Sequence, residues 1–318
     1  MTTNPTRSSW SRDNLFAQRV PDEIVGHRPS VKKGVTRVGP FAQRWIERGV
    51  GPRVLLLHGI YAGANGDEWA RLVPQLRAQR TLRVPDLLGC GTSDRPDLEY
   101  TPEVLLAAVD TLIRDAGPDV HVVASSLTGA YVVRAIREGA PVSRLTLITP
   151  TGLGRAQAHP ASAAAGFVYA LGRHTPIGDI ITQILGSKWS VRWFLERQAY
   201  GDRRKVTDAA VDSYHRATHQ RNAKHLALAF VFGRLALALD DTEVKACEPD
   251  VLWAGADGFS PRADAQAWSD ARAHVVIFEG VGLPQAEVPE LVADLVLGDW
   301  REEAIGRRHS DGPPCPPR

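Results

Sequence analysis

Residues 120–131 read VHVVASSLTGAY, and this stretch decides the fold. Residues 120–124 are mostly apolar and β-branched, which is typical of a short buried strand. Residues 127–138 carry apolar side chains three and four positions apart, which predicts a helix. Ser125 and Ser126 lie between the two elements. A strand that turns sharply into a helix through one serine is a nucleophile elbow, which holds the Ser126 hydroxyl beside free N–H groups of the helix.

The usual form of this motif is Gly-x-Ser-x-Gly, because the strained turn has room only for small neighbours. Ala124 and Thr128 occupy the two glycine positions here, and Gly129 follows. A second interpretation is an ordinary turn in which Ser126 only caps the helix. The motifs elsewhere in the chain decide between the two.

Three further motifs accompany the elbow. Residues 55–59 read LLLHG, residues 84–96 read VPDLLGCGTSDRP, and residues 252–257 read LWAGAD. In this order and spacing the chain resembles the α/β-hydrolase superfamily over about residues 34–300. It is similar in particular to a subset with an A-S-S-L elbow and a G-x-G-L ending. The resemblance implies an oxyanion turn at the first motif and a catalytic acid at the third.

The predicted fold class is α/β, with a mostly parallel sheet flanked by helices and a helical cap insertion. Strand and helix patterns alternate up to residue 148, which favours a parallel sheet covered on both faces. Residues 34–47 alternate in polarity like an opening antiparallel hairpin. The expected divisions are a polar arm at 1–30, a core at 31–152 and 246–300, a cap at 153–245 and a disordered tail at 301–318.

The predicted cap contains helical patterns and no convincing strand. Residues 223–239 are apolar on most faces and predict one helix. These apolar residues either pack helix on helix or form the wall of an apolar pocket, and the sequence leaves both open. A pocket with such a lining would favour an uncharged hydrophobic ligand.

Acyl transfer needs a nucleophile, a base, an acid that orients the base, and donors for the oxyanion. The resemblance implies Ser126 as the nucleophile, Asp257 as the acid, and the backbone N–H groups of Ile60 and Leu127 as the oxyanion donors. Asp257 precedes Gly258, so it is equally a candidate for a plain turn residue. The residues predicted to line the pocket are His58, Tyr61, Ser125 and Leu283.

The base is where the chain departs from the family. The family pattern is G-x-G-H-x-P-x-x-E-x-P, whereas residues 280–289 read GVGLPQAEVP. The histidine is absent and the segment is one residue short. The substitutes that the predicted cap offers are His159, His174, His215, His219 and His225, and nothing in the sequence selects one.

Two functions follow from these motifs. The first is an esterase-like or lactonase-like hydrolase that uses Ser126, with activity that is weak or repurposed for a non-hydrolytic tailoring step. The alternative is a non-catalytic ligand-binding pseudohydrolase that keeps the pocket. Members of this fold with an aspartate nucleophile are excluded, because position 126 is serine.

Composition sets the remaining expectations. The chain has 318 residues, 43% hydrophobic and 23% charged, with a net charge of +2, which gives no reason to expect nucleic acid or an anionic membrane as a partner. Residues 1–30 contain no continuous apolar run, so no signal peptide or membrane span is expected. Cys90, Cys247 and Cys315 lack metal-ligand spacing. We therefore expect a cytoplasmic monomer or homodimer without a metal or cofactor.

Overall fold

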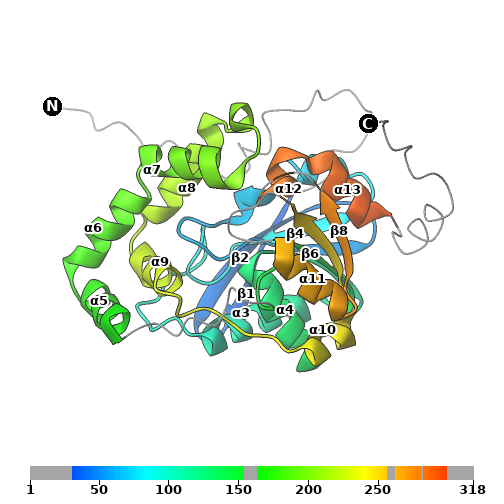
Figure 1. Ribbon diagram of the computed structural model, residues 1–318, viewed down its shortest axis with the longest axis horizontal. Coiled ribbons are helices and arrows are strands. Elements are labelled where there is room, and N and C mark those ends of the chain that lie inside the picture. Colours follow the sequence, from blue (N-terminus) through cyan, green and yellow to red (C-terminus); the bar gives the residue numbers. More distant parts are fainter. Residues whose placement is uncertain (1–30, 154–162, 256–261, 279, 281, 299–318) are drawn as a thin grey trace, which may run out of the picture.

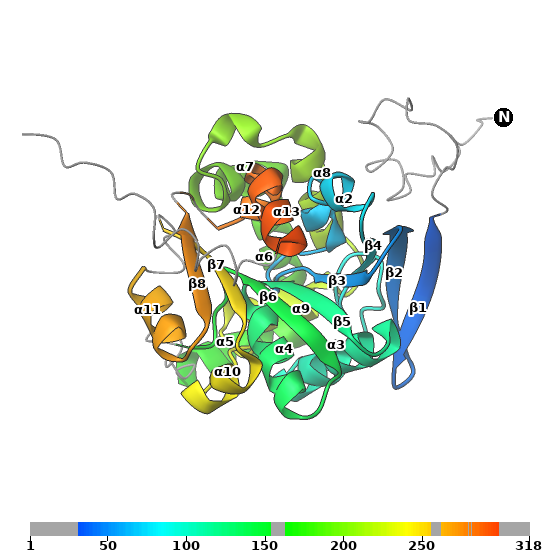
Figure 2. The ribbon, with the colours of Figure 1, turned by 90° about the vertical axis from the view of Figure 1, so that its right-hand side faces the viewer.

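The computed structural model describes residues 31–153, 163–255, 262–278, 280 and 282–298, and these form one sheet with helices on both faces (Figures 1 and 2). The eight strands are ordered β1-β2-β4-β3-β5-β6-β7-β8. β1 and β2 pair antiparallel, β2 pairs antiparallel with β4, and all other pairs are parallel. The strands are β1 Lys32–Val38, β2 Phe41–Gly49, β3 Arg53–Leu57, β4 Thr81–Pro85, β5 Val120–Ser125, β6 Val142–Ile148, β7 Asp250–Ala254 and β8 His274–Phe278. The predicted α/β class, mostly parallel sheet and opening hairpin are confirmed.

Two hydrophobic layers sandwich the sheet, because successive side chains of a strand point to opposite faces. Leu55 and Leu57 face the layer of α3 (Pro102–Ala116) and α4 (Leu127–Arg137). Val54 and Leu56 face the layer of α2 (Val73–Leu76) and α13 (Pro289–Leu297). Figure 2 shows these helices on opposite sides of the strands. The central strands are buried on both faces, as parallel sheets require.

Helices occupy the chain between β6 and β7. We call α5–α9 the helical insertion: α5 Ala163–His174, α6 Pro176–Leu185, α7 Lys188–Phe194, α8 Asp208–Thr218 and α9 Ala223–Val231. A π-helical turn, Leu195–Ala199, continues α7, and α10 (Asp241–Cys247) leads back to the sheet. In Figure 1 the insertion forms the side of the molecule away from α11 (Arg262–Asp270) and α13.

The single helix predicted over residues 223–239 is wrong in length. α9 ends at Val231, and Gly233 follows with φ +67°. The N–H groups of Gly233 and Arg234 donate to the carbonyls of Phe230 and Ala229, both at 2.9 Å, which closes the last turn. A glycine in the left-handed region ends helices in this way at no steric cost. Apolar composition alone did not reveal this break.

Several predictions fall on residues outside the described ranges. They include the arm at 1–30, the tail at 301–318, Asp257 and His159. Within the described ranges, no helix is long and apolar enough to cross a membrane. Those same residues contain no group of three or more His, Cys, Asp or Glu side chains arranged to hold a metal ion.

Candidate active site

Ser126 lies at a sharp turn between β5 and α4. β5 ends at Ser125, α4 begins at Leu127, and Ser126 itself has φ 53° and ψ −132°. A non-glycine residue in this region of positive φ stores strain, which is characteristic of functional turns. The Ser126 side chain makes no capping hydrogen bond to the helix. The interpretation of Ser126 as a plain helix cap is therefore wrong.

Thr128 explains how a residue larger than glycine fits the elbow. Its hydroxyl is buried and donates to the carbonyl of His58 at 2.6 Å. This bond ties the first turn of α4 to the His-Gly turn after β3. The family's second glycine position is thus occupied by a side chain that finds its own partner in the neighbouring turn.

His58 has a structural role in that turn. Its Nε2 accepts the N–H of Leu87 at 3.1 Å, so the ring proton must be on Nδ1, which lies 2.7 Å from the carbonyl of Gly59. The ring is buried, and both nitrogens are engaged. His58 fixes the turn and is not a free base for Ser126.

Gly59 brings the turn against the nucleophile. A methyl group in place of its hydrogen would lie 2.8 Å from Cε1 of Tyr61 and 3.4 Å from Cβ of Ser126. Both side chains therefore crowd the same backbone position. The predicted oxyanion donors belong to the two elements that meet here. Leu127 opens α4, where an N–H has no intrahelical acceptor, and Ile60 follows Gly59.

A buried carboxylate, Glu68, organises this region and was not identified from the sequence. Its Oε2 accepts the N–H of Gly59 at 3.1 Å and the hydroxyl of Tyr61 at 2.6 Å. Its Oε1 accepts the side-chain amide of Gln285 at 2.7 Å. Since Tyr61 donates its only hydroxyl hydrogen to Glu68, the hydroxyl of Tyr214, 3.0 Å away, donates to Tyr61. The two tyrosine rings stack with centroids 5.8 Å apart.

The two tyrosines are neutral hydrogen-bond donors. Burial of each hydroxyl, with the adjacent Glu68 charge as the next cause, raises the pKa of Tyr61 and of Tyr214 well above 10. Tyr214 belongs to α8, so this chain of hydrogen bonds joins the helical insertion to the turn beside Ser126. No sequence motif marked Glu68, Tyr214 or Gln285, because each matters only through partners that are distant in the chain.

The loop after β8, where the family carries its histidine, is filled by an apolar side chain. Leu283 is buried in a cluster with insertion residues that include Val191 and Leu195, and its N–H donates to the carbonyl of Ala199 at 3.1 Å. Gln285, in the short helix that begins at Pro284, is also fully buried, and its amide lies 3.2 Å from the hydroxyl of Ser125. This loop therefore contacts the elbow through the hydrogen bond between Gln285 and Ser125.

Three of the described histidines of the insertion, His215, His219 and His225, have partners of their own. His225 is buried, its Nε2 lies 3.3 Å from a carboxylate oxygen of Asp97, and burial lowers its pKa. His215 hydrogen-bonds the carbonyl of Gly186 at 2.8 Å, and its ring lies 4.0 Å from that of His219. His174 is exposed. Among the described residues, no histidine hydrogen-bonds to Ser126.

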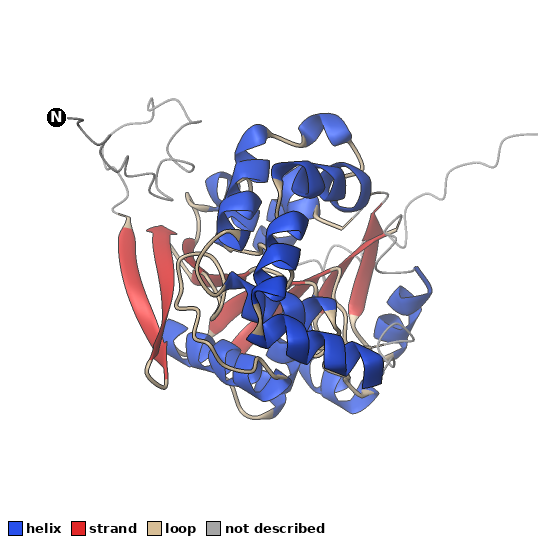
Figure 3. Cartoon of the chain, turned by 90° about the vertical axis from the view of Figure 1, so that its left-hand side faces the viewer, coloured by secondary structure: helices blue, strands red, loops and turns tan. Residues whose placement is uncertain are grey.

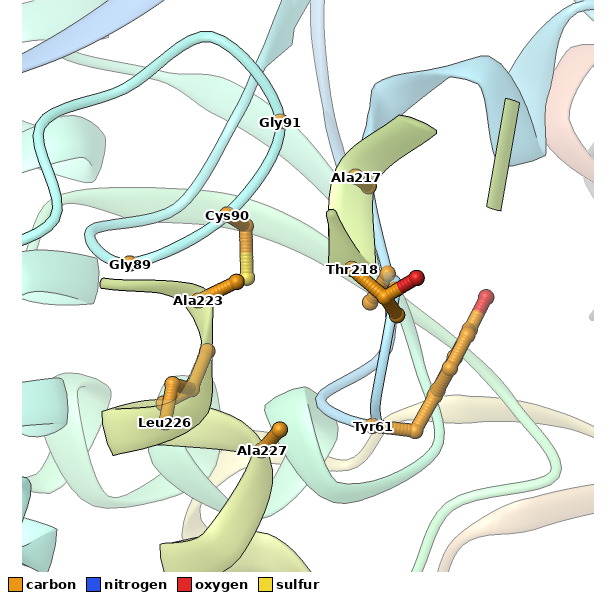
Figure 4. Close-up of a pocket in the computed structure, with 11 residues that line it drawn as sticks. Tyr61, Gly89, Cys90, Gly91, Ala217, Thr218, Ala223, Leu226 and Ala227 are labelled. Atoms are coloured by element: carbon orange, nitrogen blue, oxygen red, sulfur yellow. The ribbon is translucent and has the colours of Figure 1, made fainter. Parts of the chain in front are cut away.

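A small pocket of about 260 Å³, counting its open mouth, lies between the core and the insertion (Figure 4). Its lining includes Tyr61, Cys90, Thr218 and, from α9, Ala223 and Leu226. The water-reachable part is about 10 Å³, room for about one water molecule. Burial raises the pKa of the Cys90 thiol far above its usual range, so Cys90 is an apolar wall rather than a nucleophile.

Of the residues predicted to line a pocket, only Tyr61 borders this one. His58 and Ser125 are fully buried and do not border it, and Leu283 packs against residues of the insertion. Tyr61 is half-buried: its ring borders the pocket while its hydroxyl points to Glu68. The catalytic role of Ser126 and the oxyanion roles of Ile60 and Leu127 stay predictions.

The comparisons with known proteins agree with the fold. Residues 54–295 match the alpha/beta hydrolase family, so the chain belongs to that family. Over 95 residues, 29% of the chain, it is 33% identical to a 2-hydroxy-6-oxo-6-(2'-aminophenyl)hexa-2,4-dienoic acid hydrolase from Metapseudomonas resinovorans. This match covers only 33% of that relative's length.

A longer match is to a pimeloyl-[acyl-carrier protein] methyl ester esterase from Aromatoleum aromaticum. The identity is 29% over 237 residues, which cover 73% of this chain and 79% of the esterase. Among solved structures, the meta-cleavage product hydrolase from Pseudomonas fluorescens IP01 is similar with a TM-score of 0.67 and 21% identity, covering 85% of this chain and 98% of that one. This structural likeness concerns the fold.

Proposed function

We propose that this chain is an esterase-like or lactonase-like member of its family that acts through Ser126 on an uncharged hydrophobic small molecule. The observation that carries the proposal is the strained backbone of Ser126, with its hydroxyl free of any capping bond and its Cβ against the Gly59 turn. Strain of this kind persists only where surrounding structure enforces it. A match to a methyl ester esterase supports ester chemistry.

The roles assigned to other residues follow from the same geometry. The N–H groups of Leu127 and Ile60 would stabilise the developing oxyanion, and preorganised donors of this kind are worth about 10²–10³-fold in rate each. Asp257 would orient a base. Residues 153–245 would form a cap over the site, and its side of the small pocket is lined by Thr218 and by the apolar residues Ala217, Ala223, Leu226 and Ala227. We retain the expectation of a cytoplasmic monomer or homodimer that needs no cofactor.

Activity in this proposal is weak or repurposed, because the base is missing. A triad member can be removed with about 10³–10⁴-fold catalysis over water remaining. Leu283, in the loop where the family carries its histidine, packs against the insertion. The same packing favours the second candidate, a non-catalytic ligand-binding pseudohydrolase that retains the fold and the pocket.

Covalent labelling separates the two candidates. We expect a fluorophosphonate to label the chain slowly and at Ser126, with no label on Ser126→Ala. Thr128→Ser is a matched control, since it keeps the bond to His58 and leaves the nucleophile untouched. If prolonged exposure labels neither the parent chain nor the control, the hydrolytic proposal is wrong and the binding candidate stands. Rapid stoichiometric labelling would mean that an unidentified base serves Ser126.

A further inference from the structure

The helical insertion carries apolar side chains on its outer surface. On α6, Ile180 and Ile184 are 56% and 64% exposed, and on α7 Trp189 is 78% exposed. Trp193, one turn along α7 from Trp189, is also exposed, as is Ile177 at the start of α6. Apolar residues that recur along one side of consecutive helices indicate a surface that something covers. Figure 3 views the molecule from this side.

The packing of α6 enforces this outward orientation. The residues of α6 that are buried are Gly178 and Thr182, and Ile181 is partly buried against the core. The other three isoleucines of the helix, Ile177, Ile180 and Ile184, are exposed. A methyl group at Gly178 would lie 2.0 Å from the carbonyl oxygen of Gly172 in α5, so the two backbones are in close contact. Rotating α6 to bury Ile180 and Ile184 would break this contact. The apolar face is therefore built into the fold.

The charge of the insertion identifies the kind of partner. Residues 163–231 contain ten Lys or Arg and five Asp or Glu, a net charge of +5, whereas the whole chain is +2 and the remainder is thus −3. The small overall charge conceals this asymmetry. An exposed apolar face with tryptophans, on a segment of net positive charge, is the pattern of helices that lie at an anionic lipid surface. Lys188 and Arg192 beside the tryptophans are paired with Asp212 and Asp208, so the excess positive charge belongs to other basic side chains of the insertion.

A second copy of the chain fits this surface less well. Symmetric dimers bring the same patch of both subunits together, so two segments of +5 would face each other. Like charges in apposition oppose association, whereas anionic headgroups attract the same charges. Tryptophan also favours the boundary between headgroups and acyl chains.

We propose that the outer face of α6 and α7 docks the protein on an anionic phospholipid bilayer. Ile180, Ile184 and Trp189 would enter the headgroup boundary, and the basic side chains of the insertion would remain among the headgroups. This docking does not depend on catalysis by Ser126. It replaces the expectation from overall charge that no membrane is involved.

Vesicle flotation of the full chain tests the proposal. We expect binding to vesicles of phosphatidylcholine mixed with phosphatidylglycerol, weaker binding to phosphatidylcholine alone, and loss of binding at high salt. Ile184→Gln and Trp189→Gln should each weaken binding about tenfold, because each removes one buried apolar side chain. Val50→Gln is the matched control, since Val50 is 60% exposed but lies outside the insertion, and it should leave binding unchanged.

Three results would overturn the docking proposal. The full chain could fail to float with any vesicle, or the Ile184 and Trp189 variants could bind as the parent does. The third is a dimer in light scattering without vesicles that the same two variants convert to monomer, which would make this face a self-association surface. Unchanged thermal unfolding of the variants shows that they remain folded.

Discussion

The two loops that meet at the elbow, one after β3 and one after β8, differ in what they bury. The loop after β3 buries a polar side chain, since Glu68 accepts hydrogen bonds from Gly59, Tyr61 and Gln285. The loop after β8 buries Leu283 against the helical insertion. The glycines and prolines of the family pattern are present in the loop after β8, and Gly59 follows His58 in the loop after β3. The difference teaches that the loop after β8 lies beside the elbow through apolar packing, with a leucine near the position where the family pattern has histidine, whereas the loop after β3 is held by hydrogen bonds.

The largest expected effect comes from making the second loop resemble the family. Inserting His between Gly282 and Leu283 restores both the imidazole and the missing residue of length. If Ser126 and Asp257 hold their predicted roles, hydrolysis of a small activated ester should rise about 10²–10⁴-fold, the usual contribution of general-base assistance. Steady-state kinetics of the purified variant measure the gain.

Two controls belong to the insertion experiment. Leu283→His alone supplies an imidazole but leaves the loop one residue short and removes a buried leucine, so its gain should be smaller. Adding Ser126→Ala or Asp257→Ala to the insertion variant should abolish the gain. A folded insertion variant without any gain would mean that the elbow and the loop no longer share hydrolase geometry.

The second prediction concerns the first loop and is smaller. Glu68→Leu deprives three hydrogen-bond donors of their acceptor, and we expect the free energy of unfolding to fall by about 1–3 kcal/mol. Glu68→Gln should lower the free energy of unfolding by less. The amide oxygen of the new glutamine can still accept hydrogen bonds from Gly59 and Tyr61. Gln285 can turn its own amide so that its oxygen accepts from the new NH₂ group. Urea unfolding compares the two variants, and Ser126 labelling should slow in the same order. Equal stability of both variants and the parent would show that Glu68 does not hold the turn.

The fold was predictable because its signals are local. The elbow at Ser126, the His58-Gly59 turn and the alternation of strands and helices each depend on neighbouring residues. The parallel sheet then follows from the connections between its elements. Helix ends were less certain, and the break at Gly233 inside an apolar run was missed because hydrophobicity does not report a change in backbone direction.

The site was predictable only in part. Ser126 and the turn at Gly59 lie next to each other, as the motifs implied. The hydrogen-bond network around Glu68 was not predicted from the sequence. Its members come from η1 (Gly66–Trp69), α8 and α12 (Pro284–Glu287), and only tertiary structure brings them together. A glutamate beside a tryptophan has no signature in one sequence that separates a buried acceptor from a solvated charge.

Tyr214→Phe has the smallest expected effect and tests whether the first loop is joined to the insertion. Burial raises the pKa of Tyr214 and of Tyr61, and it also raises the pKa of each of the other four tyrosines. Each neutral tyrosine therefore stabilises the fold fully below about pH 10, its unfolded pKa, and this contribution is lost as the pH rises toward the folded pKa. Stability should decline above about pH 10, by up to about 1.4 kcal/mol per pH unit for each tyrosine.

Removing the Tyr214 hydroxyl eliminates one of these titrations. The variant should lose about 1 kcal/mol at neutral pH, the net worth of one hydrogen bond, and its stability should decline less steeply than the parent's above about pH 10. Tyr169→Phe is the matched control: it should also flatten the alkaline decline, but only Tyr214→Phe should slow the labelling of Ser126, because Tyr214 bonds to Tyr61. Urea unfolding at a series of alkaline pH values gives the slopes. An unchanged slope in Tyr214→Phe would mean that its hydroxyl is solvated, so that no chain of hydrogen bonds connects α8 to Glu68.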